Sequence, residues 1–326
     1  MHFQNALLTI ALMCAASLFI FVFLKLGSSA QGVRGDATQR YLYDKIIEVD
    51  GVKYRERKQI TTVLLLGVDR YSDQEERLDV FNGGLADFQR LIVIDHEQKT
   101  VFQLQIDRDT MVPITILGPL GDEIGKAERQ ICLAYSYGDG SETSRKYAVE
   151  AVSEFLHGIS INFCIALKMD GVPVLNDLVG GIEVTLDDDF TVVDPTWTKG
   201  TTINLMGDQA ETFVRRRMDV SDGMNESRMR RQQQYIEKLS AKLMRRFSAN
   251  KNFIGTVYDE LDEYMSTDMA RGRLINEVWN AKNYRRPEMI TLPGTHNLNE
   301  NNNWECHVDD SAVQAAVLEL FYEPLK

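Results

Sequence analysis

The sequence predicts an α/β protein in which a central, mainly β sheet is flanked by helices and preceded by one N-terminal transmembrane helix. Two observations predict the α/β fold. Apolar runs of strand length alternate with amphipathic segments of helical periodicity, and the folded region has the size of one large α/β unit. A third observation, a long uncharged segment near the N-terminus, predicts the transmembrane helix.

The N-terminal segment begins with a short tail, residues 1–5, and continues into a predicted membrane anchor at residues 6–27. From Ala6 to Leu24 the segment carries no charge, and about 20 apolar residues suffice to cross a bilayer. A cleaved signal peptide is the alternative, because Ser28 to Ala30 offer small residues for cleavage. The tail MHFQN lacks the basic residues of a signal peptide, so we favour the anchor.

The orientation of this anchor is not fixed by the charges beside it. Four basic residues follow the span, where the positive-inside rule would read them as cytoplasmic: Lys25, Arg34, Arg40 and Lys45. Local charge alone therefore argues weakly against an extracytoplasmic domain.

A polar, partly helical linker is predicted at residues 28–58, followed by the folded domain at residues 59–326. The domain opens with ITTVLLLGVD, whose continuous apolar run reads as a strand buried on both faces and ending at Asp69. Two β-rich runs joined by HEQK read as a hairpin whose second strand delivers Asp107, Arg108 and Asp109. Ligands of α/β sheets gather at strand ends, so these acids are expected to be neighbours of Asp69.

The middle of the chain reads as scaffold. Residues 144–158 have helical periodicity and stop at a glycine, residues 161–169 are strand-like, and residues 171–181 are helix-like. The strand-like IEVTL follows and leads into Asp187–Asp189. Three consecutive carboxylates could bind a metal, but a solvated loop is the more common structure for such a run.

Six arginines lie between residues 213 and 234, in a chain of net charge −12. Arginine presents a rigid donor fork that matches phosphate oxygens, so the cluster predicts a site for a local anion, with a solvated helix face as the alternative. A nucleic-acid partner is not expected, because the acidic chain offers no broad positive field. If residues 226–243 form one helix, Arg228, Arg231 and Gln232 share a face and can meet a single anion.

Cysteine and histidine give little chemistry. Cys132, Cys164 and Cys306 form no CxxC pair and are expected to be buried apolar fillers. The five histidines show no metal-ligand spacing, and His296 and His307 are candidate ligands by residue type alone. Acid–base work is therefore left to carboxylates. A capped amphipathic helix is expected to begin near Asp310 and close the chain.

Several stretches, taken in order, resemble the LytR-CpsA-Psr family of envelope proteins between Thr61 and Leu243. The matching stretches are TTVLLLGVD, the ADF segment around Asp87, QIDRDTMV, QICLAYSYGDG, DGVPVLNDLVGGIEV, GDQAETFVRRR and SRMRRQQQ. The resemblance implies a central sheet flanked by helices, with a long apolar pocket for a lipid. It also implies a single-pass protein of the cell membrane whose domain lies outside the cytoplasm.

The activity implied by the resemblance is a phosphotransferase reaction. It would move a teichoic acid or capsular glycopolymer from an undecaprenyl-pyrophosphate carrier to peptidoglycan and would depend on Mg²⁺. Negative charge develops on phosphoryl oxygens during such a transfer, so fixed arginines and a divalent cation would supply most of the catalysis.

The resemblance assigns roles to individual residues. Asp69 and Asp87 would hold Mg²⁺, and Arg108, the catalytic arginine, would contact pyrophosphate while Asp109 orients it. The remaining pyrophosphate ligands would come from the arginine cluster: Arg215, Arg217, Arg228 and Gln232.

One position departs from the family pattern. Family members commonly carry an arginine two residues before the second magnesium-binding acid, whereas this chain has Leu85. Arg90 is expected to point to the opposite face of its strand from Asp87, and Arg70 or Arg77 could compensate from the preceding loop. Three functions therefore stay open: the transferase, a polyprenyl-pyrophosphate hydrolase, and a non-catalytic lipid-phosphate binding or regulatory protein.

Overall fold

The computed structural model describes residues 46–69, 83–118, 120–216, 220, 225–300 and 303–325. The predicted anchor at residues 6–27 lies outside these residues. Within the described ranges, no helix is long and apolar enough to cross a membrane.

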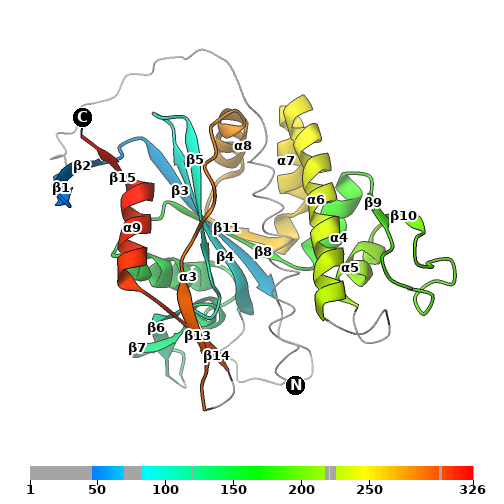
Figure 1. The fold of residues 1–326 in the computed structure, drawn as a ribbon, viewed down its shortest axis with the longest axis horizontal. Coiled ribbons are helices and arrows are strands. Elements are labelled where there is room, and N and C mark those ends of the chain that lie inside the picture. Colours follow the sequence, from blue (N-terminus) through cyan, green and yellow to red (C-terminus); the bar gives the residue numbers. More distant parts are fainter. Residues whose placement is uncertain are drawn as a thin grey trace.

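A six-stranded mixed sheet forms the centre of the molecule (Figure 1). Its strands, in spatial order, are β11 (Met265–Thr267), β8 (Phe163–Lys168), β3 (Ile60–Asp69), β4 (Leu85–Asp95), β5 (Thr100–Ile106) and β12 (Ile290–Thr291). β3 is parallel to β8 and antiparallel to β4. β3 and β4 are buried along almost their whole length because both faces of the sheet are covered. The predicted β4–β5 hairpin is confirmed.

One face of the sheet is covered by α2 (Leu133–Ser136), α3 (Glu142–Phe155) and α9 (Asp310–Phe321). Leu64 of β3 and Leu91 of β4 are fully buried in this core, together with Val152 of α3 and Leu320 of α9. The helix predicted near Asp310 is therefore confirmed, and the Asp309 side chain caps it by accepting from Ser311 N.

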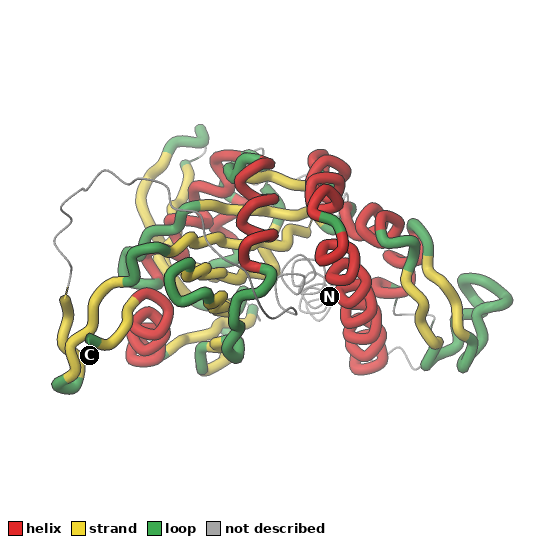
Figure 2. The backbone as a smooth tube through the Cα atoms, turned by 90° about the horizontal axis from the view of Figure 1, so that it is seen from above, coloured by secondary structure: helices red, strands yellow, loops and turns green. Residues whose placement is uncertain are grey.

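The opposite face is covered by a larger set of helices. They are α4 (Gly171–Leu178), α5 (Asp208–Arg215), α6 (Asn225–Ala249), α7 (Lys251–Glu260) and α8 (Arg271–Ala281), with a 3-10 turn, η1 (Asp262–Tyr264), after α7. Leu65, Ile92 and Ile165 of the sheet pack against them. Figure 2 shows the strands as a layer between two sets of helices, which confirms the predicted α/β arrangement.

Four small sheets lie outside the central sheet in the described part of the chain. Three are hairpins: β6 (Met111–Leu117) with β7 (Glu123–Gln130), β9 (Ile182–Thr185) with β10 (Thr202–Leu205), and β13 (Gly294–Leu298) with β14 (Trp304–Val308). The segment that holds β13 and β14 is polar and rich in turn-forming residues. Its strands have no buried apolar alternation, which is why periodicity does not reveal them.

The fourth small sheet joins the two ends of the described chain. β1 (Ile46–Val49) and β2 (Val52–Glu56) form a hairpin, and β15 (Tyr322–Pro324) adds to the free side of β2. An ion pair between Arg55 and Glu323 links β2 to β15. The described end of the linker is therefore strand, where the sequence suggested partial helix.

Candidate functional site

Two buried carboxylates lie where β3 and β4 meet. Asp69 is the last residue of β3 and stands opposite Leu85, and Asp87 lies beside a register shift between the two strands. Both acids are more than nine-tenths buried. Gly84 makes this approach possible: its φ is +79°, and a Cβ there would lie 2.5 Å from the Asp69 carbonyl oxygen.

Arg108 completes the group from the turn after β5. Its Nη1 lies 2.6 Å from Asp87 Oδ1, and its Nε lies 3.4 Å from Asp109 Oδ1. The turn is fixed because Asp109 N donates to Asp107 Oδ1 at 2.9 Å and Cys132 N donates to the Arg108 carbonyl at 3.2 Å. The structure thus brings together the acids and the arginine that the sequence placed at strand ends.

The segment after β7 braces both halves of this site. Cys132 O accepts from Ala86 N at 3.3 Å, and Ser136 O accepts from Gly83 N at 3.4 Å. Gln130 Nε2 donates to Asp109 Oδ1 at 2.8 Å. The stretch QICLAYSYGDG therefore holds the start of β4 against the Arg108 turn, through its backbone and the side chain of Gln130.

The electrostatics of Asp87 favour a bound cation. Burial raises the pKa of Asp87 to about 7, against the opposing effect of Arg108, and the charges of Asp69 and Asp109 raise it further. Its Oδ1 is buried and is paired with Arg108 Nη1. Carboxylate oxygens are the ligands that Mg²⁺ prefers, so Asp69 and Asp87 fit a hard divalent cation.

Asp109 lies in a related environment. Burial raises its pKa, and Arg108 opposes this shift. Its contacts with Arg108 and Gln130 place its carboxylate between the guanidinium and β7, where it can orient Arg108.

Arg231 has a different role from the one expected. It is 2% exposed, and its Nη1 donates to Asp188 Oδ2 at 2.7 Å. Its remaining nitrogens donate to the carbonyls of Phe213 and Arg216. Arg231 therefore fastens α6 to the end of α5, and the prediction that it meets an anion with Arg228 is wrong. Asp188, taken up by this pair, belongs to the same structural contact.

The other pyrophosphate ligands remain predictions. Arg217 and the side chains of Arg215, Arg228 and Gln232 lie outside the part of the chain that the structure describes. The backbones of Arg215 on α5 and of Arg228 and Gln232 on α6 belong to the two helices that Arg231 joins.

Arg90 does not take the place of the family's arginine, whose position is occupied by Leu85 in this chain. Its guanidinium donates to the side-chain oxygens of Gln103 and Gln105 and stacks on the Phe88 ring at 4.9 Å. Burial lowers its pKa to about 10. Arg70 and Arg77, the other candidates, lie outside the described residues.

A narrow apolar pocket opens on the helix-rich face of the sheet, beneath α8. It holds about 330 Å³ of space free of protein atoms, counting the part open to solvent. Its lining comes from the sheet, from α8 and from the loop before α8: Val63, Leu65, Ile92, Ile94, Ile165, Met269, Leu274 and Glu277. Its enclosed part is much smaller than this volume and lies well below the roughly 300–1,000 Å³ of small-molecule pockets, so a long lipid chain needs neighbouring side chains to move.

Sequence reasoning missed the surroundings of Asp107. His296 Nε2 lies 3.0 Å from Asp107 Oδ2, and Cys306 lies beside them. No spacing in the sequence signals this group, because strand pairing between β13 and β14 creates it.

Comparison with known proteins fixes the relationship that the motifs suggested. A model of the LytR_cpsA_psr family matches residues 26–320. The chain belongs to the LytR_cpsA_psr family.

Relatives and solved structures agree with this LytR_cpsA_psr assignment. A protein of Bacillus mycoides (strain KBAB4) named polyisoprenyl-teichoic acid–peptidoglycan teichoic acid transferase TagU is 27% identical over 260 residues, which cover 79% of this chain and 77% of that protein. The crystal structure of protein gbs0355 from Streptococcus agalactiae has a TM-score of 0.56 at 20% identity, covering 82% and 91% of the two chains. That of B. subtilis TagV has a TM-score of 0.53 at 23% identity, covering 80% and 97%. Both structures have the same fold as this chain.

Proposed function

We propose that this protein is a cell-wall glycopolymer transferase that moves a teichoic acid or capsular chain from a polyprenyl-pyrophosphate carrier to peptidoglycan. Membership of the family and the name of the TagU relative support this function. The observation that carries it is the convergence of Asp69, Asp87 and Arg108 at one buried point.

The arrangement suits phosphoryl transfer. The acceptor hydroxyl oxygen forms a bond to the glycan-side phosphorus, the pyrophosphate P–O bond breaks, and polyprenyl phosphate leaves while the hydroxyl proton is lost. Arg108, held by Asp87 and Asp109, would meet the charge that develops on the phosphoryl oxygens. Mg²⁺ held by Asp69 and Asp87 would supply further neutralising charge. The partners in the arginine cluster would be Arg215, Arg217, Arg228 and Gln232.

The pocket beneath α8 suits the lipid part of the donor. Apart from Glu277 its lining is aliphatic or Met, and an isoprenoid chain is recognised by apolar contact alone. We also propose that residues 6–27 anchor the protein in the cell membrane with the domain outside the cytoplasm, where the lipid carrier and peptidoglycan are accessible.

Leu85 favours a second candidate, in which the fold binds lipid phosphates without transferring the glycan or hydrolyses them slowly. Leu85 stands directly across from Asp69, so this position adds no positive charge to that of Arg108. Losing one such contact costs the transition state more than the bound ground state.

The test uses the full chain in detergent micelles with a polyprenyl-pyrophosphate-linked glycan and peptidoglycan, with Mg²⁺ or with EDTA. We expect Mg²⁺-dependent transfer that falls by about 100- to 1,000-fold in Arg108→Ala, the loss typical of a removed electrostatic contact. Arg129→Ala, an exposed arginine of β7, is the matched control and should leave turnover unchanged.

Three outcomes separate the candidates. Glycan on peptidoglycan supports the transferase, and phosphate released without glycan transfer supports the hydrolase. Tight donor binding that is equal with and without Mg²⁺, and no turnover, would reject both in favour of a binding protein.

A further inference from the structure

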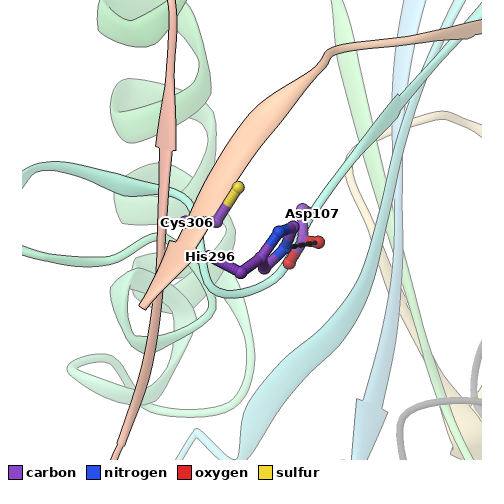
Figure 3. A group of neighbouring side chains, drawn as sticks. All are labelled: Asp107, His296 and Cys306. Carbon is purple, nitrogen blue, oxygen red and sulfur yellow. Dashed lines mark hydrogen bonds and ion pairs between the residues drawn. The ribbon is translucent and has the colours of Figure 1, made fainter. Parts of the chain in front are cut away.

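The β13–β14 hairpin lies against the turn that carries Arg108. Cys306 N donates to the Asp109 carbonyl at 2.8 Å, and Cys306 forms a parallel bridge with Thr110. His296 and Cys306 are direct partners across the hairpin. Pairing thus places an imidazole and a thiol beside the carboxylate of Asp107, as Figure 3 shows.

The three side chains offer three different donor atoms within a small space. His296 Nε2 lies 3.0 Å from Asp107 Oδ2, and these atoms and Cys306 Sγ all lie within 4.8 Å of one another. Bonds of about 2.0–2.3 Å to one tetrahedral ion would hold such donors roughly 3.3–3.8 Å apart. Small side-chain rotations are enough to reach that geometry.

The sulfur lies in a space that the backbone leaves for it. A Cβ on Gly294 would come 2.5 Å from Cys306 Sγ, so a larger residue at position 294 would press on the thiol. Cys306 is 1% exposed, whereas the side chains of His296 and Asp107 are 46% and 41% exposed. An ion can therefore reach the buried sulfur from the solvent side of the histidine and aspartate.

The hydroxyl of Thr110 is a further polar group beside the sulfur. This buried hydroxyl interacts with the Cys306 side chain, and among the described residues no partner of normal hydrogen-bond geometry reaches its oxygen. A hydroxyl in this place can donate to a metal-bound thiolate, which is how second-layer partners orient metal ligands.

We propose that Asp107, His296 and Cys306 form a binding site for a borderline-soft divalent cation of the zinc class. Nitrogen and sulfur donors select Zn²⁺ over Mg²⁺, and three protein ligands leave a fourth position for water. The site is chemically distinct from the all-oxygen pair of Asp69 and Asp87.

Such an ion would connect the hairpin to the catalytic turn. Asp107 directly precedes Arg108, and Cys306 already binds the backbone of Asp109. A bound ion would therefore fix the turn against β13 and β14. The inference goes beyond the proposed function, since it requires only binding and not turnover.

The test uses the full chain in detergent micelles, freed of metal, with Co²⁺ as a spectroscopic probe and Zn²⁺ as competitor. We expect one Co²⁺ with a tetrahedral spectrum and a thiolate-to-cobalt charge-transfer band. Zn²⁺ should abolish both signals, while a large excess of Mg²⁺ should not, because Mg²⁺ prefers oxygen ligands.

Two variants assign the ligands. His296→Gln changes a half-exposed side chain and should weaken Zn²⁺ binding at least tenfold, while Cys306→Ser should remove the charge-transfer band. His307→Gln is the matched control, because His307 is an exposed histidine of the partner strand β14 whose side chain points to the opposite face from Cys306, and this variant should bind as the wild type does.

The proposal is overturned by a wild type with no thiolate band, or by Zn²⁺ affinity that His296→Gln leaves unchanged. His296→Gln keeps the test decisive if Cys306→Ser fails to fold. Both readouts are independent of glycan transfer, so an inactive protein that passes them still supports this site.

Discussion

At the scale of single residues, the charge of Asp87 lowers the stability of the folded protein and is also the charge that a bound cation would need. Asp87 is buried beside Asp69 and Asp109, and only Arg108 offsets the cost of its charge. A protein selected for stability alone would place a neutral residue here. The retained carboxylate is explained if a cation binds to it.

Asp87→Asn is expected to stabilise the metal-free protein at pH 8. The pKa of Asp87 is about 7 in the folded protein, against the ordinary 3.8 of an aspartate side chain, so the folded state holds the proton more tightly. Stability from this group is therefore greatest at low pH and is lost as the pH rises from about 4 to about 7. At about 1.4 kcal/mol per unit, Asn should add roughly 2–4 kcal/mol at pH 8.

The measurement is urea unfolding in EDTA at pH 8 and pH 5. The advantage of Asp87→Asn should shrink toward pH 5, and Mg²⁺ should stabilise the wild type but not the variant. Equal stability of the two proteins at pH 8 would show that the buried charge of Asp87 does not lower the free energy of unfolding.

The sequence predicted much of this residue-scale picture. Asp69 ends one strand and Arg108 follows another, and strand ends of one sheet meet, so their approach to each other could be foreseen, whereas Asp87 was indicated only by the family resemblance. The burial of Arg231 could not, because helical spacing shows which residues share a face but not which distant carboxylate receives them. Its partner Asp188 lies 43 residues away.

At the scale of helices and strands, the buried guanidinium of Arg231 links α6 to the end of α5. Arg231 joins Asp188 to the carbonyls that end α5, and its guanidinium stacks over Phe190 at 5.1 Å. Three of the predicted pyrophosphate ligands, Arg215, Arg228 and Gln232, have their backbones on the same two helices. Arg231 therefore supports their placement without touching the substrate itself.

Arg231→Met is expected to destabilise the protein by about 3–5 kcal/mol, because it leaves Asp188 buried without its partner. Adding Asp188→Asn should recover part of the loss, since the unpaired charge is removed. Urea unfolding of both variants measures the two effects. Arg245→Met, at an exposed position of α6, is the control and should cost little.

A loss in the double variant as large as in Arg231→Met would mean that the carbonyl contacts of Arg231, rather than its pair with Asp188, hold the helices.

At this scale, periodicity predicted the elements that carry apolar faces and missed those that do not. α3, α4 and β8 were predicted because their buried residues recur at regular spacing. β1, β2, β13 and β14 are mostly exposed, and their pairing depends on partners elsewhere in the chain.

In the molecule as a whole, the two faces of the central sheet differ. One face packs into a hydrophobic core with α3 and α9, and the other carries the apolar pocket beneath α8. The carboxylates and Arg108 lie at the strand ends between these faces. The fold class was predicted from the sequence, while the pocket came only from the family resemblance, because a void leaves no pattern in a sequence.

Leu274→Phe is expected to raise KM for a long-chain polyprenyl donor several-fold, because the added ring fills space that the lipid needs. A short-chain prenyl-pyrophosphate donor should be affected much less. Steady-state kinetics with the two donors measure the difference. Leu156→Phe makes the same change in the opposite core and controls for the cost of overpacking.

An equal rise in KM for both donors, or the same effect in Leu156→Phe, would place the lipid elsewhere.

The pairing of β2 with β15 sets an order of events during synthesis. β2 lies in the middle of its small sheet, between a strand made just before it and β15, which is made much later. Because chains emerge from the N-terminus, β2 has one unpaired edge until β15 has been made. A chain cut short before Tyr322 keeps that edge exposed, so unfinished copies carry a ready site for aggregation that finished copies cover.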